Sequence, residues 1–85
     1  MHYVYVLYSK SRDQFYIGVT DDIDRRLAEH QRGKTRTTSG MMNPELTYYE
    51  ACVSRKDAEK REKQLKTGFG RGYLRKRVED YLKGG

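Results

Sequence analysis

The sequence predicts a small α/β (α+β) domain, in which a three-stranded, antiparallel-type sheet is flanked by three helices in the order β-β-α-β-α-α. Residues 3–8 alternate aromatic and β-branched side chains, a pattern typical of a strand. Near the end of the chain, apolar side chains recur at helical spacing instead. The chain has 85 residues, which is too short for two hydrophobic cores. Residues 1–85 are therefore expected to form a single domain.

The expected strands lie early and in the middle of the chain. Residues 3–8 form the first strand, the polar stretch 9–14 forms a hairpin turn, and residues 15–20 form the second strand. Residues 46–53 are expected to be the third strand.

The two-residue period of a strand decides which side chains share a face. Tyr3, Tyr5 and Leu7 share one face of the first strand, and Tyr16 can lie on the matching face of the second. The opposite face of the second strand carries three apolar side chains: Phe15, Ile17 and Val19.

A first helix is expected directly after the second strand, because three residues suited to an N-cap stand there: Thr20, Asp21 and Asp22. The helix runs to about His30 or Gln31, and Gly33 marks its stop. Residues 33–45 form a polar loop that holds the only proline, Pro44.

Two more helices are expected in the last third of the chain. One starts at Ser54, where Ser54 and Asp57 have the spacing of a capping box, and it runs to about Lys66. The glycines that follow are expected to break it: Gly68, Gly70 and Gly72. The last helix starts at about Tyr73 and carries an apolar stripe of Leu74, Val78, Tyr81 and Leu82.

Charge and composition restrict the classes of function. There are 18 Lys and Arg residues against 12 Asp and Glu residues, and the net charge of +6 favours a polyanionic partner, with nucleic acid first and an anionic membrane second. The longest uncharged run, residues 1–9, is half as long as a membrane span requires, so no membrane-spanning segment is expected. The single cysteine, Cys52, excludes an intramolecular disulfide and a cysteine-based zinc site. The cytoplasm is the expected location.

Three charged or titratable residues project onto helix faces that should be apolar. In the first helix, Ile23 and Leu27 define the core side, while His30 projects between them and Arg26 lies beside them. In the second helix, Glu62 projects into the core-facing stripe, where a carboxylate is costly unless it is paired or binds a metal. Arg26, His30 and Glu62 are therefore expected to converge toward one side of the sheet.

The candidate residues on the helices and strands also have purely structural interpretations. His30 can interact with the C-terminal helix dipole, and Glu62 can pair with Arg26 or Arg61. Tyr5 and Tyr16 can be cross-strand core aromatics. Taken together, however, two tyrosines, an arginine, a histidine and one carboxylate are typical of phosphodiester chemistry. The carboxylate suits a hard cation, the arginine suits a phosphate, and the tyrosine or histidine can move a proton.

The same residues resemble a known family. Tyr3-Val4-Tyr5 and Tyr16-Ile17-Gly18 resemble the paired motifs of the GIY-YIG endonuclease superfamily, with Tyr-Val-Tyr in place of Gly-Ile-Tyr. Arg26 and His30 resemble the helix that follows its second motif. The helix that carries the family's metal-binding glutamate is resembled by Ser54, Ala58, Glu62 and Leu65. Residues 65–71 resemble the small stand-alone bacterial members, which are related to the nuclease domain of the bacterial excinuclease.

The resemblance implies hydrolysis of DNA phosphodiester bonds with a single Mg²⁺ or Mn²⁺, and DNA repair or recombination is the expected process. It implies that Tyr5 and Tyr16 flank the attacking water and that one of them is the general base, with the choice left open. It further implies that Arg26 binds the scissile phosphate, that Glu62 holds the metal, and that His30 orients or deprotonates a tyrosine or water or assists proton transfer.

DNA contacts are expected from basic residues near the predicted loops: Arg32, Lys34, Arg36, Arg71 and Arg75. The loop reads Met42-Asn43-Pro44 where many relatives have an arginine before the proline. A homodimer or a partner protein is the expected source of specificity. The alternative function is a nucleic-acid-binding module of the same fold with weak or no catalysis. A third is an interaction domain that assembles through the tyrosine-rich sheet edge.

Overall fold

The computed structural model describes residues 1–32 and 44–84. Its strands are β1 (His2–Ser9), β2 (Gln14–Thr20) and β3 (Glu45–Cys52), and they form one antiparallel sheet in the order β2-β1-β3. The helices in the described ranges are α1 (Ile23–Gln31), α2 (Arg55–Leu65), α3 (Gly68–Arg77) and α4 (Glu79–Leu82). The predicted fold class and element order are confirmed, with the short α4 added at the end.

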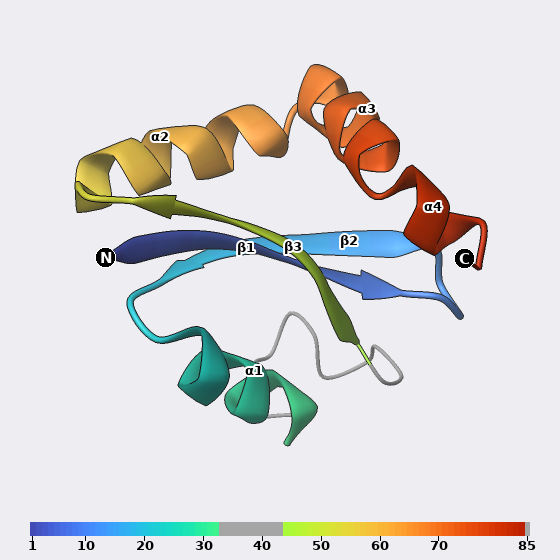
Figure 1. The fold of residues 1–85 in the computed structure, drawn as a ribbon, viewed down its shortest axis with the longest axis horizontal. Helices are drawn as coiled ribbons and strands as arrows, with labels where there is room; N and C mark the ends of the chain where they lie inside the picture. The colour runs from blue at the N-terminus through green and yellow to red at the C-terminus, as the bar shows by residue number, and fades with distance from the viewer. Residues whose placement is uncertain (33–43, 85) are drawn as a thin grey trace.

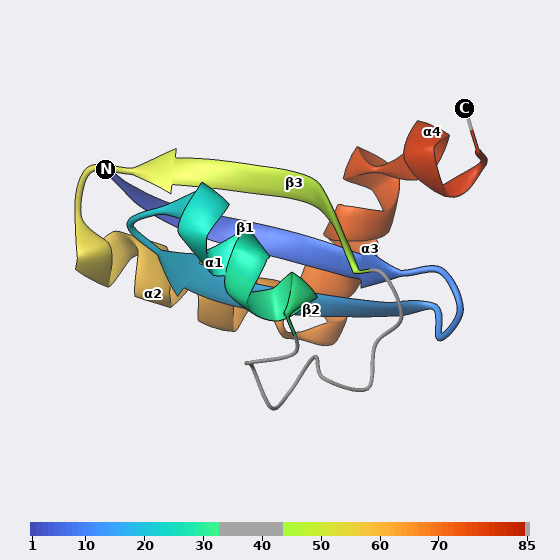
Figure 2. The ribbon, with the colours of Figure 1, turned by 90° about the horizontal axis from the view of Figure 1, so that it is seen from below.

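The sheet lies between two layers of helices. In Figure 1, α2 and α3 cover one face and α1 lies against the other. The view from below in Figure 2 agrees, because α1 lies in front of the sheet and α2 behind it. The expectation that Arg26, His30 and Glu62 converge on one side of the sheet is therefore wrong, since Glu62 belongs to α2. A helical projection shows which side of a helix faces the sheet, but it cannot show which face of the sheet the helix covers.

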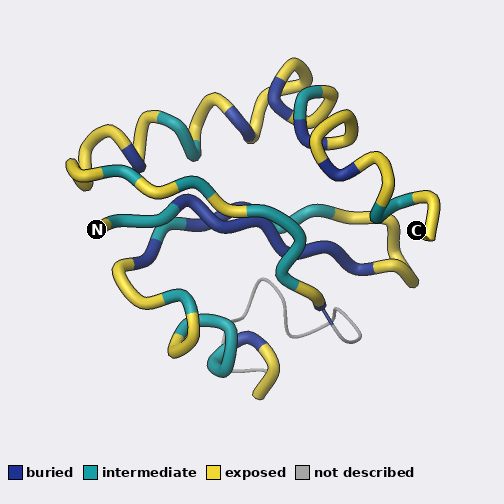
Figure 3. The backbone as a smooth tube through the Cα atoms, viewed as in Figure 1, coloured by how far each residue is buried: buried dark blue, intermediate teal, exposed yellow. Residues whose placement is uncertain are grey.

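The predicted division of the strand faces is confirmed by the register. Leu7 pairs with Tyr16 and Tyr5 pairs with Gly18, so these side chains share the face on which α1 lies. Val4 and Val6 point the other way into the core beneath α2 and α3, where they join Ile17, Ala58, Leu65 and Leu74. Figure 3 shows that burial is most continuous along the central strand β1, which has a neighbour on each side.

The prediction that the glycine-rich segment interrupts the helices is wrong. Gly68, Gly70 and Gly72 all lie within α3, and the break comes earlier, at Lys66 and Thr67. The Thr67 hydroxyl oxygen caps α3 by accepting the Gly70 N–H at 3.1 Å. A side chain at the buried Gly70 would collide with the backbone of Gln64 and Leu65, so this glycine allows α3 to start tightly against the end of α2.

Two further details differ from expectation. Ser54 is the N-cap residue of α2, but its side chain makes no capping hydrogen bond. An aspartate is one methylene shorter than the glutamate of a capping box, and Asp57 leaves the box unformed. The expected last helix is divided at Val78 into α3 and α4.

Within the described residues, no helix is both long enough and apolar enough to cross a membrane.

Candidate active site

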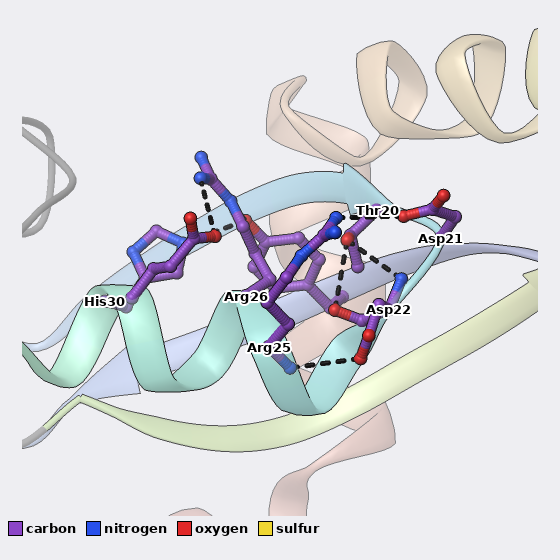
Figure 4. A network of polar contacts seen from close by, with 8 residues as sticks. Thr20, Asp21, Asp22, Arg25, Arg26 and His30 are labelled. Atoms are coloured by element: carbon purple, nitrogen blue, oxygen red, sulfur yellow. Dashed lines mark hydrogen bonds and ion pairs between the residues drawn. The ribbon is translucent and has the colours of Figure 1, made fainter.

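The side chain of Tyr5 is the centre of a buried polar cluster between β1 and α1. The residue is 2% exposed, and its Oη lies 2.9 Å from His30 Nε2. The Nε–H of Arg26 donates to the same oxygen at 3.2 Å. Figure 4 shows Arg26 and His30 extending from α1 toward this cluster. A tyrosine, a histidine and an arginine expected from the sequence are therefore brought together at one atom.

Gly18 makes room for the Tyr5 ring. The two residues pair across β1 and β2, and a Cβ built on Gly18 would lie 2.5 Å from Tyr5 Oη and 2.7 Å from Cζ. No real side chain tolerates such contacts, so the ring can extend across β2 only because residue 18 is glycine. The glycine of the Tyr16-Ile17-Gly18 motif is thus explained by the position of a tyrosine on the neighbouring strand.

The start of α1 is held by capping bonds that position the helix. Asp22 Oδ1 accepts the Arg25 N–H at 3.0 Å, and Thr20 Oγ1 accepts the Asp22 N–H at 3.1 Å (Figure 4). Arg26 and His30 are four residues apart and therefore share one side of the helix. The predicted N-cap chemistry is confirmed at Asp22, and it orients both candidate side chains toward the sheet.

Tyr16 is the more accessible of the two motif tyrosines. It lies half-buried on the edge strand β2, whereas Tyr5 is buried on the central strand. The Tyr16 ring centroid is 6.1 Å from that of Tyr5, and it meets the His30 ring edge to face at 4.8 Å. Burial is the main cause that raises the pKa of Tyr5, and the nearby Tyr16 adds to the shift. The three rings therefore form one cluster that leads from the surface to His30.

Burial shifts both titratable groups of the cluster toward their neutral forms. Burial raises the pKa of Tyr5 to about 12, although the hydrogen bond from Arg26 acts in the opposite direction. Burial also lowers the pKa of His30, and the positive charge of Arg26 lowers it further. At neutral pH the cluster therefore holds a protonated phenol and a neutral imidazole. With the His30 proton on Nδ1, the Tyr5 hydroxyl can donate to Nε2.

Arg26 connects the buried cluster to the surface. Its side chain is one-third exposed, and its Nη1 lies 3.4 Å from Glu29 Oε1. The hydrogen bond to Tyr5 is the main cause that raises the Arg26 pKa, so the guanidinium stays charged. Arg26 also lines a hollow of about 420 Å³ together with Arg25 and Arg55. Its guanidinium can therefore meet a phosphate that approaches from solvent and competes with Glu29.

Glu62 lies apart from this cluster. It is half-buried on α2, and its Oε2 lies 3.2 Å from Lys66 Nζ. The structural alternatives of a pair with Arg26 or Arg61 are wrong, because Arg26 bonds Tyr5 and Glu29 and Arg61 bonds Glu50 at 2.9 Å. The described residues contain no group of three or more His, Cys, Asp or Glu side chains that could hold a metal.

A hollow at the exposed edge of β2 is lined by residues from both sides of the sheet. It has a volume of about 470 Å³, and its lining includes Tyr16 from β2 and Lys66 from α2. Lys66 is also the partner of Glu62, one helical turn away. The edge of β2 is thus the place where a substrate can reach Tyr16 and the Glu62 end of α2 together.

The predicted nucleic-acid contacts divide into three groups. Arg71 and Arg75 line the hollow beside Tyr16, although Arg75 also bonds Asp13 at 3.2 Å. Arg32 is exposed at the C-terminal cap of α1. Lys34 and Arg36, like Met42 and Asn43, lie outside the described residues.

Sequence reasoning missed two residues of the site. Lys66 had a signal, because it follows Glu62 by four residues and a helix brings such pairs together. The role of Gly18 also had a signal, since strand alternation places it on the face of Tyr16. What was missing was the register that sets Gly18 opposite Tyr5.

Comparison with known proteins agrees with this geometry. The family model of the GIY-YIG catalytic domain matches residues 1–84, and the chain therefore belongs to this family, whose catalytic domain is of the nuclease type. A UPF0213 protein of Natronomonas pharaonis is 39% identical over 67 residues, which cover 78% of each chain. A UPF0213 protein of Staphylococcus haemolyticus is 34% identical over 80 residues, covering 93% of this chain and 95% of the relative.

A solved structure is also similar. The solution NMR structure of a UPF0213 protein from Bacillus halodurans matches with a TM-score of 0.59 and 30% sequence identity. The match covers 95% of this chain and 89% of that one. The suspected relationship to small stand-alone GIY-YIG proteins is thus confirmed.

Proposed function

We propose that this protein is a divalent-metal-dependent endonuclease that hydrolyses phosphodiester bonds in DNA. The observation that carries the proposal is the Tyr5 hydroxyl, held between the guanidinium of Arg26 and the imidazole of His30. The first group is suited to a phosphate and the second to a proton, and both act next to Tyr16 at the surface.

A proton relay follows from the two pKa shifts. With a pKa of about 12, Tyr5 stays protonated at neutral pH and cannot act as a base by itself, but its hydroxyl can donate to the neutral imidazole of His30. As water attacks phosphorus, its proton passes to Tyr16 Oη, the Tyr16 proton passes to Tyr5, and the Tyr5 proton passes to His30 Nε2. The bond from phosphorus to the leaving oxygen then breaks, the bonding electron pair stays on that oxygen, which takes a proton from water, and His30 returns its proton to solvent. We assign the water-facing position to Tyr16 because Tyr16 is half-buried and Tyr5 is not exposed.

Arg26 links substrate binding to this relay. In the free protein its positive charge opposes protonation of His30. A phosphate bound to Arg26 would offset that charge and so favour the imidazolium that the relay produces. The same guanidinium would stabilise the negative charge that develops on the phosphoryl oxygens.

The donor set around Glu62 fits a metal that is held mainly by water and substrate. Mg²⁺ commonly binds to proteins through one or two carboxylates and completes its shell with water and substrate phosphate. Glu62 would hold the cation in place of the Lys66 ammonium. The bound cation would supply charge neutralisation at the leaving oxygen. Mn²⁺ suits the same ligand set.

Separate observations support the remaining parts of the proposal. The similarity of residues 65–71 to excinuclease-related members favours a role in DNA repair or recombination, in the cytoplasm. A homodimer or a partner protein would supply DNA specificity. The alternative function, a binding module with weak or no catalysis, is favoured by one specific observation: the sheet separates the helix of Glu62 from the cluster around Tyr5.

The test is a cleavage assay with supercoiled, flapped and branched DNA in Mg²⁺, in Mn²⁺ and in chelator. We expect cut strands only with metal, and loss of cutting in Glu62→Gln. Glu59→Gln is the matched control, because Glu59 lies on the same helix and forms an exposed i,i+4 pair with Arg55. Absence of cutting on every substrate, with DNA binding retained, would favour the binding module.

A further inference from the structure

Helix α3 has an exposed surface that the proposed chemistry does not use. Phe69 is 95% exposed, the highest value among the exposed large apolar side chains of the described residues. An aromatic ring that is free of protein contact loses the energy of burial and stays in water. Phe69 also stands between Lys66 and Arg71, both of which line the hollow beside Tyr16.

Two glycines near Phe69 in the sequence are not required by the packing of the residues that the structure describes. Among the described residues, a Cβ at Gly68 or Gly72 would meet no atom within 4 Å, and neither glycine has a positive φ. A glycine in a helix is nevertheless destabilising by roughly 0.5–1 kcal/mol relative to alanine. Gly70 is different, because its position is filled by the backbone of α2. The surface of α3 at Gly68 and Gly72 therefore carries no side chain, although the packing of the described residues would allow one.

The helical period places these features in a definite order around α3. At about 100° per residue, Arg71 and Arg75 lie on one side, Gly68 and Gly72 come next, and Phe69 follows with Lys76. The backbone surface at the two glycines thus lies between the two arginines and the exposed ring of Phe69. Helix α3 carries four Lys or Arg residues and no acidic residue within Gly68–Arg77. Asp13, bonded to Arg75, is the acidic residue that lines the neighbouring hollow.

We propose that this surface binds an unpaired DNA strand, with phosphates at Arg71 and Lys66, the sugar-phosphate backbone crossing Gly68 and Gly72, and a base stacked on Phe69. The charge of α3 favours a polyanion over an apolar partner, and a base offers a flat surface to an exposed aromatic ring. In duplex DNA the same base would be covered by its neighbours. The inference rests on the proposed function and adds the substrate class: DNA with unpaired nucleotides near the bond that Tyr16 faces.

The test measures binding in chelator, where no strand is cut, by fluorescence anisotropy of a labelled single strand, the matching blunt duplex and a flapped duplex. We expect Phe69→Ala to weaken binding of the single strand and the flap by about 5- to 150-fold, the range for loss of one base-aromatic stack. Binding of the blunt duplex should change less than about 2-fold. Phe69→Tyr should restore the preference, because it restores a ring. Val53→Ala is the matched control, as Val53 is 84% exposed beside the other end of α2.

A second variant distinguishes an effect of the glycine surface on DNA binding from an effect on folding. Gly72→Ala should raise the melting temperature, since alanine favours a helix, and still weaken binding of the single strand. Unchanged binding in both Phe69→Ala and Gly72→Ala would overturn the proposal. So would an equal loss on all DNAs, or a change in oligomeric state without a change in DNA affinity, which would identify a second copy as the occupant.

The same experiment distinguishes this inference from the proposed function. Selective binding through Phe69 without cutting on any substrate would reject the nuclease and retain the binding surface. Cutting with binding that is independent of Phe69 would reject the surface and retain the nuclease.

Discussion

The ring of Tyr5 lies against the α-carbon of Gly18, its partner on the neighbouring strand, in space that a Cβ would occupy. This contact sets the position of the Tyr5 hydroxyl and, through it, the distances to His30 and Arg26. The Gly18 α-carbon of the second motif thus supports Tyr5, the catalytic candidate of the first motif. The relationship makes the site sensitive to a single methyl group.

We expect Gly18→Ala to displace the Tyr5 ring and break its hydrogen bond to His30. The ring is buried, so it cannot simply swing away, and overpacking of this kind destabilises by about 1–3 kcal/mol. Cleavage should fall by more than tenfold at temperatures where the variant is folded. The measurements are thermal unfolding and the initial cleavage rate. Wild-type activity in a folded Gly18→Ala protein would show that the ring position is not needed.

Arg26→Lys tests whether the guanidinium itself is required. Lysine keeps the charge, but an ammonium cannot donate along the Tyr5 bond and also present two parallel donors to a phosphate. We expect the cleavage rate at saturating DNA to fall by at least about tenfold, with a smaller change in DNA affinity. Arg25→Lys is the matched control, because Arg25 is the exposed neighbour on the same helix. Equal effects of the two substitutions would contradict the role given to Arg26.

The pH dependence of stability should reveal the buried imidazole. The pKa of His30 is lowered in the folded protein from its ordinary value of 6.5, so between these two values the unfolded chain binds more protons. Stability is therefore fully present above pH 6.5 and is lost as the pH falls toward the lower folded value. The pKa values of Asp13 and Glu50 are also lowered, from 3.8 and 4.5, so their contributions are lost at more acidic pH.

This prediction is checked by measuring the free energy of unfolding by denaturant between pH 7 and 5. His30→Gln should flatten the slope in this interval, because glutamine does not titrate. An unchanged slope in the variant would mean that His30 is not the group responsible. Cleavage by the wild-type protein should decline over the same interval, since a protonated imidazole cannot accept the Tyr5 proton.

Much of the fold and part of the site could be predicted from sequence because they depend on local rules. Strand alternation correctly put Tyr5 and Tyr16 on one face, and helical spacing correctly paired Arg26 with His30. The choice of sheet face for α2 depends on tertiary packing, and there the expectation for Glu62 was wrong. The helical state of residues 68–72 was missed for a similar reason. Their glycines disfavour a helix locally, but Gly70 allows close packing against α2.

Single-turnover cleavage with Tyr5→Phe measures whether the Tyr5 hydroxyl carries the proton relay. The matched control is Tyr8→Phe, which removes another hydroxyl of β1, one that bonds Asp13 at 2.6 Å on the opposite face of the sheet. Tyr5→Phe leaves His30 Nε2 without this partner and should reduce stability by about 1–2 kcal/mol. We predict that Tyr5→Phe lowers the cleavage rate by about 100-fold or more while Tyr8→Phe cleaves at a rate close to wild type. A folded Tyr5→Phe protein that cleaves as fast as Tyr8→Phe would show that the Tyr5 hydroxyl does not carry the proton.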